Sequence, residues 1–141
     1  MELSEVIIAK IKNEGPIPFN DFMEMSLYYP GMGYYASAQE SIGTNGDFYT
    51  SPCLSPVFGA MVSKQIEEMW TLMGKTDFTI VEFGAGKGSL CAHIMQYIEY
   101  TNPQLYEKLN YAIIEKSPAM RQHEQESISR DKVCWYDGMQ D

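Results

Sequence analysis

A turn with three alternate glycines follows a short apolar stretch near the middle of the chain. Residues 79–90 read TIVEFGAGKGSL, so β-branched residues lead to Glu82 and glycines occupy positions 84, 86 and 88. β-branched residues favour strands, and glycine accepts backbone conformations that other residues avoid. A chain that turns this tightly between a strand and a helix can bring its N–H groups and the helix N-terminus close to a ligand. The pattern therefore predicts a strand, a binding turn and a helix, in that order.

Strands and helices are expected to alternate from residue 75 onward. Residues 78–83 are nearly all apolar, which is typical of a strand buried on both faces of a parallel sheet. Further strands are predicted over 111–115 and 132–136, with helices between them. Because parallel crossovers are right-handed, the second strand should lie beside the first and the third outside the second. The predicted fold class is α/β: a Rossmann-like domain with an incomplete parallel sheet of three strands over 75–141, preceded by a helical region over 1–74.

The helical region is marked by capping residues and by apolar residues at helical spacing. The pattern predicts one helix that ends at Gly15–Pro16, a second over 21–28 with Asn20 as its N-cap, and a third from Ser55–Pro56 to Gly74.

Two segments of this region are irregular and rich in residues that can contact ligands. The first, residues 28–35, has tyrosine pairs around a Pro-Gly turn and is either a cover over one edge of the core or the wall of a binding site. The second, residues 42–52, combines glycines, hydroxyls and Asp47, and is either a functional loop or a simple connection. Composition alone leaves both alternatives open.

Composition and charge limit the functional classes. The net charge of −9 argues weakly against broad nucleic-acid binding and is compatible with a cationic substrate or partner. No apolar run has the roughly 18 residues of a membrane span. The acidic N-terminus resembles neither a secretory signal nor an organelle presequence, so a cytoplasmic protein is expected. The three cysteines and two histidines lack the spacing of metal ligands, and no metal site is predicted.

The spacing of the glycines distinguishes between ligands. A dinucleotide fingerprint requires a glycine where this chain has Ser89, and no Gly-Lys-Ser/Thr follows at the distance of a Walker loop. The remaining pattern, Glu-x-Gly-x-Gly-x-Gly, resembles the first motif of class I S-adenosylmethionine-dependent methyltransferases. An acid at the end of the first strand can hold the cationic amino-acid end of that cofactor, and an acid after the second strand can accept the ribose hydroxyls. The predicted cofactor-binding residues are Glu82, Gly84, Ala85, Gly86, Gly88 and Glu115.

A narrower resemblance appears when the N-terminal half is added. The block GPIPF at 15–19, the segment LYYP at 27–30, the block GDFYTSP at 46–52 and the glycine turn are similar, in this order, to the MidA-like family. These methyltransferases are related to the mitochondrial complex I assembly enzyme that methylates a protein arginine. The resemblance implies S-adenosylmethionine as cofactor and a protein substrate, which could be a respiratory-complex subunit.

The same resemblance suggests roles for the 46–52 loop. Asp47 is the candidate for orienting the methyl acceptor, and Thr50 and Ser51 are candidates for contacts with substrate or cofactor. Family members continue well beyond a third strand, so the chain is expected to be an N-terminal fragment that is inactive by itself. Two alternatives remain open: a non-catalytic binding module on the same fold, and a dehydrogenase, which Ser89 disfavours.

Overall fold

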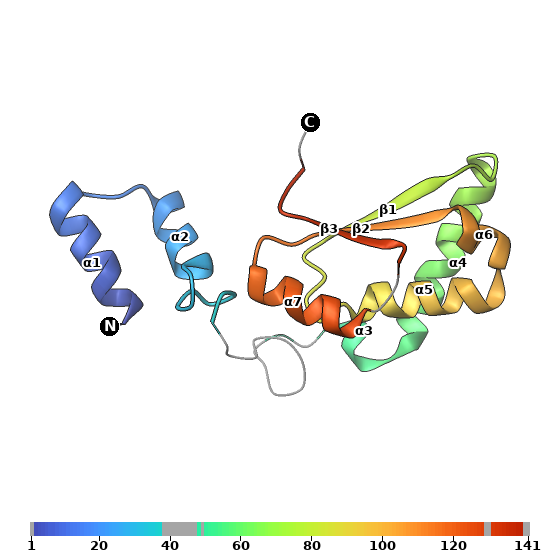
Figure 1. Ribbon diagram of the computed structural model, residues 1–141, viewed down its shortest axis with the longest axis horizontal. Coiled ribbons are helices and arrows are strands. Elements are labelled where there is room, and N and C mark those ends of the chain that lie inside the picture. The colour runs from blue at the N-terminus through green and yellow to red at the C-terminus, as the bar shows by residue number, and fades with distance from the viewer. Residues whose placement is uncertain (1, 38–47, 49, 129–130, 140–141) are drawn as a thin grey trace.

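The computed structural model describes residues 2–37, 48, 50–128 and 131–139 of the chain. Figure 1 shows two N-terminal helices beside a layer of strands with helices beneath it. The helices are α1 (Leu3–Glu14), α2 (Phe19–Tyr28), α3 (Ser51–Leu54), α4 (Pro56–Leu72), α5 (Ser89–Thr101), α6 (Pro103–Lys108) and α7 (Pro118–Ser127), and the strands are β1 (Phe78–Phe83), β2 (Leu109–Ile114) and β3 (Val133–Tyr136).

The three strands form one parallel sheet in the order β1-β2-β3. Phe78 of β1 lies opposite Leu109 of β2, and Tyr111 of β2 lies opposite Val133 of β3. The α/β fold class, the helical region before the strands and the strand order are therefore as predicted. All three strands run in the same direction, so their carboxyl ends meet at one edge of the sheet, where α/β proteins bind ligands.

The core lies between the sheet and the helices that pack against one side of it. In Figure 1 the helices α4, α5 and α7 run along one side of the sheet. Trp70 of α4 belongs to this core and donates its indole N–H to the carbonyl oxygen of Thr76 at 2.8 Å. The predicted division of the chain after residue 74 stays a prediction. Helix α4, which precedes this position, packs on α5, which follows it. The buried cluster consists of Trp70, Cys91, Ile94, Met95, Ile98, Leu105, Leu109, Tyr111, Ile113, Ile128 and Val133.

The prediction that the first strand is buried on both faces is wrong. Residues of β1 alternate between half-buried and exposed, with Val81 49% and Phe83 63% exposed. Successive side chains of a strand point to opposite faces. Within the described residues, the core helices pack on one face only, so the apolar side chains of the other face remain open to solvent.

Several element boundaries also differ from the prediction. Helix α2 begins at Phe19, because the N–H of Phe22 already bonds to the carbonyl of Pro18 at 3.1 Å; Asn20 is therefore not its N-cap. The cap at Ser55 is confirmed, since its hydroxyl oxygen accepts the N–H of Val57 at 3.2 Å.

Three further segments differ from the prediction. Residues 51–54, at the end of the segment predicted to be irregular, form the short helix α3. Strand β2 begins at Leu109, two residues before the prediction, and ends at Ile114, so that Glu115 is the first residue after it. The piece over 103–108, predicted only as amphipathic, is the helix α6.

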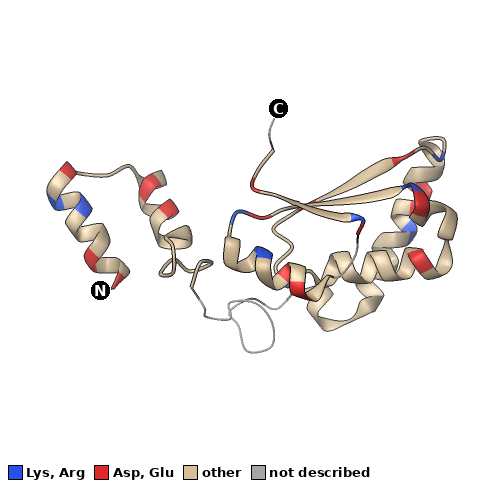
Figure 2. Cartoon of the chain, in the orientation of Figure 1, with Lys and Arg blue, Asp and Glu red and all other residues tan. Residues whose placement is uncertain are grey.

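Acidic residues are distributed over both parts of the chain. Figure 2 shows them on α1 and α2 as well as on the helices that pack against the sheet. Crossing a bilayer requires a long apolar helix, and none of the helices in the described ranges meets that requirement.

Candidate functional site

The glycine turn joins β1 to α5 at the carboxyl edge of the sheet. Gly84, Gly86 and Gly88 all have positive φ angles, of 65°, 63° and 72°. This left-handed region strains residues with a Cβ, so glycine is favoured at each of these positions. The N–H of Gly84 bonds to the carbonyl of Ile114 at 2.9 Å, which holds the start of the turn beside the end of β2. The turn therefore has the tight geometry that its sequence predicts.

An acidic residue lies at the end of each of the first two strands. Glu82 accepts a hydrogen bond from the Tyr111 hydroxyl at 2.7 Å. Burial raises the pKa of Glu82, and the hydrogen bond from Tyr111 partly offsets this effect. Glu115 is 8% exposed, and its Oε1 accepts the backbone N–H of Ser117 at 2.7 Å. Both carboxyl groups are thus held in place beside the turn.

Two cavities adjoin the turn, and they share Tyr35, Gly84 and Gly86 as lining residues. The strand-end cavity has a volume of about 480 Å³, and the helix-start cavity has a volume of about 320 Å³. Ligand sites in proteins are typically of this size. The strand-end cavity is lined by Tyr28, Tyr35, Phe83, Gly84, Gly86, Ile114, Glu115, Lys116, Met120 and Asp137. The helix-start cavity is lined by Tyr35, Phe48, Thr50, Pro52, Cys53, Glu82, Gly84, Ala85, Gly86, Lys87, Ser89 and Leu90.

The N-terminal tyrosines form part of both cavities. Tyr28 lines the strand-end cavity, and Tyr35 lines both the strand-end and the helix-start cavity. Two contacts attach this segment to the sheet domain: the Ser117 hydroxyl donates to the carbonyl of Tyr35 at 2.7 Å, and Lys116 pairs with Glu24 at 2.5 Å. The ammonium group of Lys116 also lies 4.6 Å from the centre of the Tyr28 ring. Of the two interpretations that the sequence leaves open, this geometry favours the wall of a binding site.

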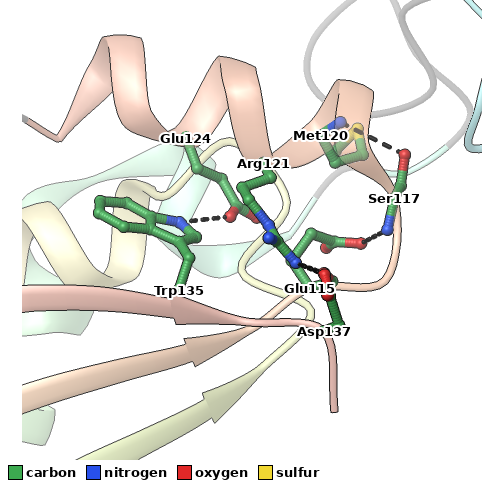
Figure 3. Close-up of polar contacts among 7 residues, drawn as sticks. All are labelled: Glu115, Ser117, Met120, Arg121, Glu124, Trp135 and Asp137. Carbon is green, nitrogen blue, oxygen red and sulfur yellow. Dashed lines mark hydrogen bonds and ion pairs between the residues drawn. The ribbon is translucent and has the colours of Figure 1, made fainter.

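The outer rim of the strand-end cavity is fixed by an arginine of α7. As Figure 3 shows, Arg121 lies between the ends of the two neighbouring strands and contacts Asp137 and the backbone at Glu115. Its guanidinium donates to the carbonyl of Glu115 at 2.9 Å and forms an ion pair with the Asp137 carboxylate. Asp137 is therefore held at the rim with its carboxylate partly neutralised.

A third acid, Glu124, is buried behind the turn. Its side chain is 0% exposed, and its Oε2 accepts the indole N–H of Trp135 at 2.9 Å, as drawn in Figure 3. Its Oε1 is buried without a hydrogen-bond partner among the described residues. Burial, together with the nearby charge of Glu115, raises the pKa of Glu124 to about 7. Glu124 therefore takes up a proton near neutral pH, at a higher pH than an exposed glutamate does.

The structure brings most of the predicted site residues together. Glu82 and Ala85 line the helix-start cavity, Glu115 lines the strand-end cavity, and Gly84 and Gly86 line both. Thr50, a predicted loop contact, also lines the helix-start cavity.

Two predicted residues among those described do not line the two cavities. Ser51 and Gly88 line neither of them, and a Cβ at Gly88 would lie 2.5 Å from the Ile128 side chain. Gly88 therefore faces the core. Asp47, the candidate for orienting the methyl acceptor, lies outside the described residues.

Sequence reasoning missed several lining residues. Lys116, Met120 and Asp137 line the strand-end cavity, but no motif marks them. Lys116 could have been suspected because it follows the predicted strand-end acid, whereas Asp137 is brought to the site only by the position of β3. A larger groove of about 750 Å³ between α4 and α5 contains none of the predicted site residues.

Comparison with known proteins identifies relatives over most of the chain. A zebrafish (Danio rerio) protein named protein arginine methyltransferase NDUFAF7, mitochondrial, is 31% identical over 133 residues, which cover 93% of this chain and 31% of the relative. The Drosophila melanogaster homologue of that protein is 36% identical over 97 residues, which cover 68% of this chain and 22% of the relative. The chain thus spans about a third or less of these relatives.

A solved structure supports the same relationship. A Burkholderia thailandensis protein, described as a candidate methyl transferase and crystallised with S-adenosyl-homocysteine, superposes with a TM-score of 0.79 at 31% identity. The match covers 98% of this chain and 37% of that protein. A family profile described as "Putative S-adenosyl-L-methionine-dependent methyltransferase" matches residues 61–141, more than half of the chain. The chain therefore belongs to this family of S-adenosyl-L-methionine-dependent methyltransferases.

Proposed function

We propose that this chain forms the S-adenosyl-L-methionine-binding part of a methyltransferase that modifies an arginine of a protein. The observation that carries the proposal is the pair of adjoining cavities at the glycine turn, each with its own strand-end acid. The family membership and the arginine methyltransferases among the relatives support it.

The cavities suit the chemistry of this cofactor. Glu82, beside the helix-start cavity, offers a carboxylate to a cationic amino-acid end, and Glu115 offers one to the ribose hydroxyls. Gly84 and Gly86 lie between these two acids and allow the backbone to approach a ligand closely. The half-buried Tyr28 and Tyr35 provide an apolar wall, as is common in small-molecule sites.

When bound, S-adenosyl-L-methionine supplies a methyl group on a cationic sulfur. The contribution of the chain to transfer would be binding and orientation, because alignment of donor and acceptor can supply much of the rate acceleration in such reactions. Thr50 and Ser51 remain candidates for contacts with substrate or cofactor, and Asp47 remains the candidate for orienting a guanidinium group.

The proposed partner is a protein, and its finer identification as a respiratory-complex subunit follows only from the family resemblance. The net charge of −9, distributed as in Figure 2, suits a cationic acceptor such as arginine and disfavours nucleic acid. Among the described residues, the three cysteines form no disulfide, which suits a reducing compartment such as the cytoplasm. The vertebrate and insect relatives are named as mitochondrial.

Calorimetric titration with S-adenosyl-homocysteine tests the cofactor assignment. The wild-type chain is expected to bind, and ligand at about 100 times its dissociation constant should stabilise the chain by about 2.7 kcal/mol. Gly86→Val should abolish binding, because it adds bulk at the wall of both cavities. Gly74→Val, which also replaces a glycine of positive φ but lies outside the lining residues, should reduce stability while binding persists. Equal affinity of the Gly86→Val variant and the wild type would refute the site.

Methyl transfer is tested separately with the complete gene product, methyl-labelled S-adenosyl-L-methionine and cell extract, because the chain by itself is expected to be inactive. Label recovered as methylarginine supports the proposed reaction, and label on another residue type contradicts the choice of acceptor. Cofactor binding without transfer would favour a non-catalytic binding module on this fold.

A further inference from the structure

A buried tyrosine lies directly behind the acid of the glycine turn. Tyr111 is in the middle of β2, opposite Ile80 of β1, and its side chain is 2% exposed. Its hydroxyl donates to Oε2 of Glu82 at 2.7 Å. The two residues are 29 positions apart, so the contact depends on the pairing of β1 with β2.

The contact is too well formed to be incidental. A buried hydroxyl without a partner costs free energy, and the Glu82 carboxylate satisfies this one. A hydrogen bond to a charged group contributes more to stability than one between two neutral groups. Tyr111 engages Oε2, and no hydrogen bond to Oε1 is formed within the described part of the chain, so this oxygen can face a ligand in the helix-start cavity that Glu82 lines.

We propose that Tyr111 is a positioning residue that holds the Glu82 carboxylate at the wall of the helix-start cavity, where it would bind the cationic amino-acid end of the cofactor. This inference rests on the proposed function. Tyr111 does not line either cavity at the turn, so it acts through Glu82 and does not touch the ligand itself.

The charge state of Glu82 depends on the same contact. Burial raises the pKa of Glu82, and the hydrogen bond from Tyr111 lowers it. Loss of the hydroxyl should therefore raise the pKa of Glu82 further, so that the carboxyl group takes up a proton at a higher pH and loses its attraction for an ammonium group.

Other titratable groups surround this pair. Glu124 of α7 interacts with the charge of Glu82, and the Cys91 thiol of α5 interacts with Tyr111. Lys87, in the turn, lines the same cavity as Glu82. Because these groups adjoin the pair, the test compares variants that differ in a single hydroxyl or carboxyl group.

The test measures the affinity of the chain for S-adenosyl-homocysteine by calorimetry between pH 5.5 and 8.5. Tyr111→Phe keeps the ring in the core and removes only the hydroxyl. It is expected to weaken binding about tenfold at pH 7, because the Glu82 carboxylate is then less well oriented and more readily protonated. The pH below which affinity falls should also move upward, a change that a purely structural role of Tyr111 would not produce. Tyr100→Phe, which removes an exposed hydroxyl, is the control and should bind as the wild type does.

A double-variant cycle separates positioning from packing. In a Glu82→Gln background, which has no carboxylate to position, Tyr111→Phe should have no further effect on affinity. An equal loss in both backgrounds would overturn the proposal, as would an unchanged affinity and pH profile for Tyr111→Phe alone.

A carboxyl NMR titration of Glu82 distinguishes this inference from the function on which it rests. If the wild type does not bind S-adenosyl-homocysteine, the proposed function fails and the role in cofactor binding fails with it. The positioning of Glu82 by Tyr111 is still supported if the pKa of Glu82 is higher in Tyr111→Phe than in the wild type. It is overturned if the pKa of Glu82 is the same in both.

Discussion

Replacement of Glu124 by glutamine is expected to remove part of the pH dependence of the chain's stability. Glu124 is 0% exposed, with one carboxyl oxygen on the indole of Trp135 and the other without a partner among the described residues. A charge at this position is poorly solvated, so the folded chain favours the protonated acid. Glutamine has nearly the same shape and remains neutral at every pH.

The magnitude follows from the difference between the folded and ordinary pKa values of Glu124. Burial raises the pKa of Glu124 from the ordinary value of 4.5 to about 7. Since one pKa unit corresponds to about 1.4 kcal/mol, ionising Glu124 in the folded chain costs about 3 kcal/mol. The pKa of Glu124 is higher in the folded chain than in the unfolded chain. The protonated side chain therefore stabilises the fold fully below about pH 4.5, and this stabilisation is lost as the pH rises through about 7.

Urea unfolding followed by tryptophan fluorescence between pH 5 and 8 measures the effect. The stability of Glu124→Gln relative to the wild type should rise by roughly 2 to 3 kcal/mol over this range. Glu126→Gln, which removes an exposed carboxylate from the same helix, serves as the matched control and should show a nearly constant difference. A constant difference for Glu124→Gln as well would show that Glu124 is already ionised in the folded chain, and would refute the reasoning.

Two further predictions concern the attachment of the tyrosine segment. A Cβ at Gly33 would lie 2.5 Å from the backbone nitrogen of Tyr29, so Gly33→Ala should displace Tyr35 and weaken S-adenosyl-homocysteine binding several-fold. The control is Gly138→Ala, which should not weaken binding because the space around Gly138 is open. Equal calorimetric affinities of the two variants would contradict this prediction. Ser117→Ala removes both the N-cap hydrogen bond of α7 and the bond to the carbonyl of Tyr35, and should cost about 1–2 kcal/mol in urea unfolding. A loss within the error of that measurement would show that the segment is held by other contacts.

Much of the fold follows from local patterns in the sequence. The strand over 78–83 was predicted with its observed bounds, because a β-branched run followed by alternate glycines permits few other structures. The cap at Ser55 was predicted because an N-cap hydroxyl followed by proline acts within a single turn of chain. The order of the strands was predicted because the handedness of parallel crossovers is general.

Predictions failed where the outcome depends on what packs against an element. The apolar run of β1 indicates burial, yet Val81 and Phe83 are exposed because the core helices lie on the other face. Helix α2 begins before Asn20 because the carbonyl of Pro18 already accepts a helical hydrogen bond, which outweighs the capping preference of asparagine.

For the candidate site, the sequence by itself determined the glycine turn, the two strand-end acids and the family. Only the tertiary structure decided that Tyr35 lines both cavities, that Arg121 holds Asp137 at the rim, and that Tyr111 supports Glu82. The physical reason is the range of the interactions. Turns, caps and strand ends are set by residues close together in the chain, whereas a hydrogen bond between β1 and β2 exists only after the register of the sheet has brought the two side chains to the same face.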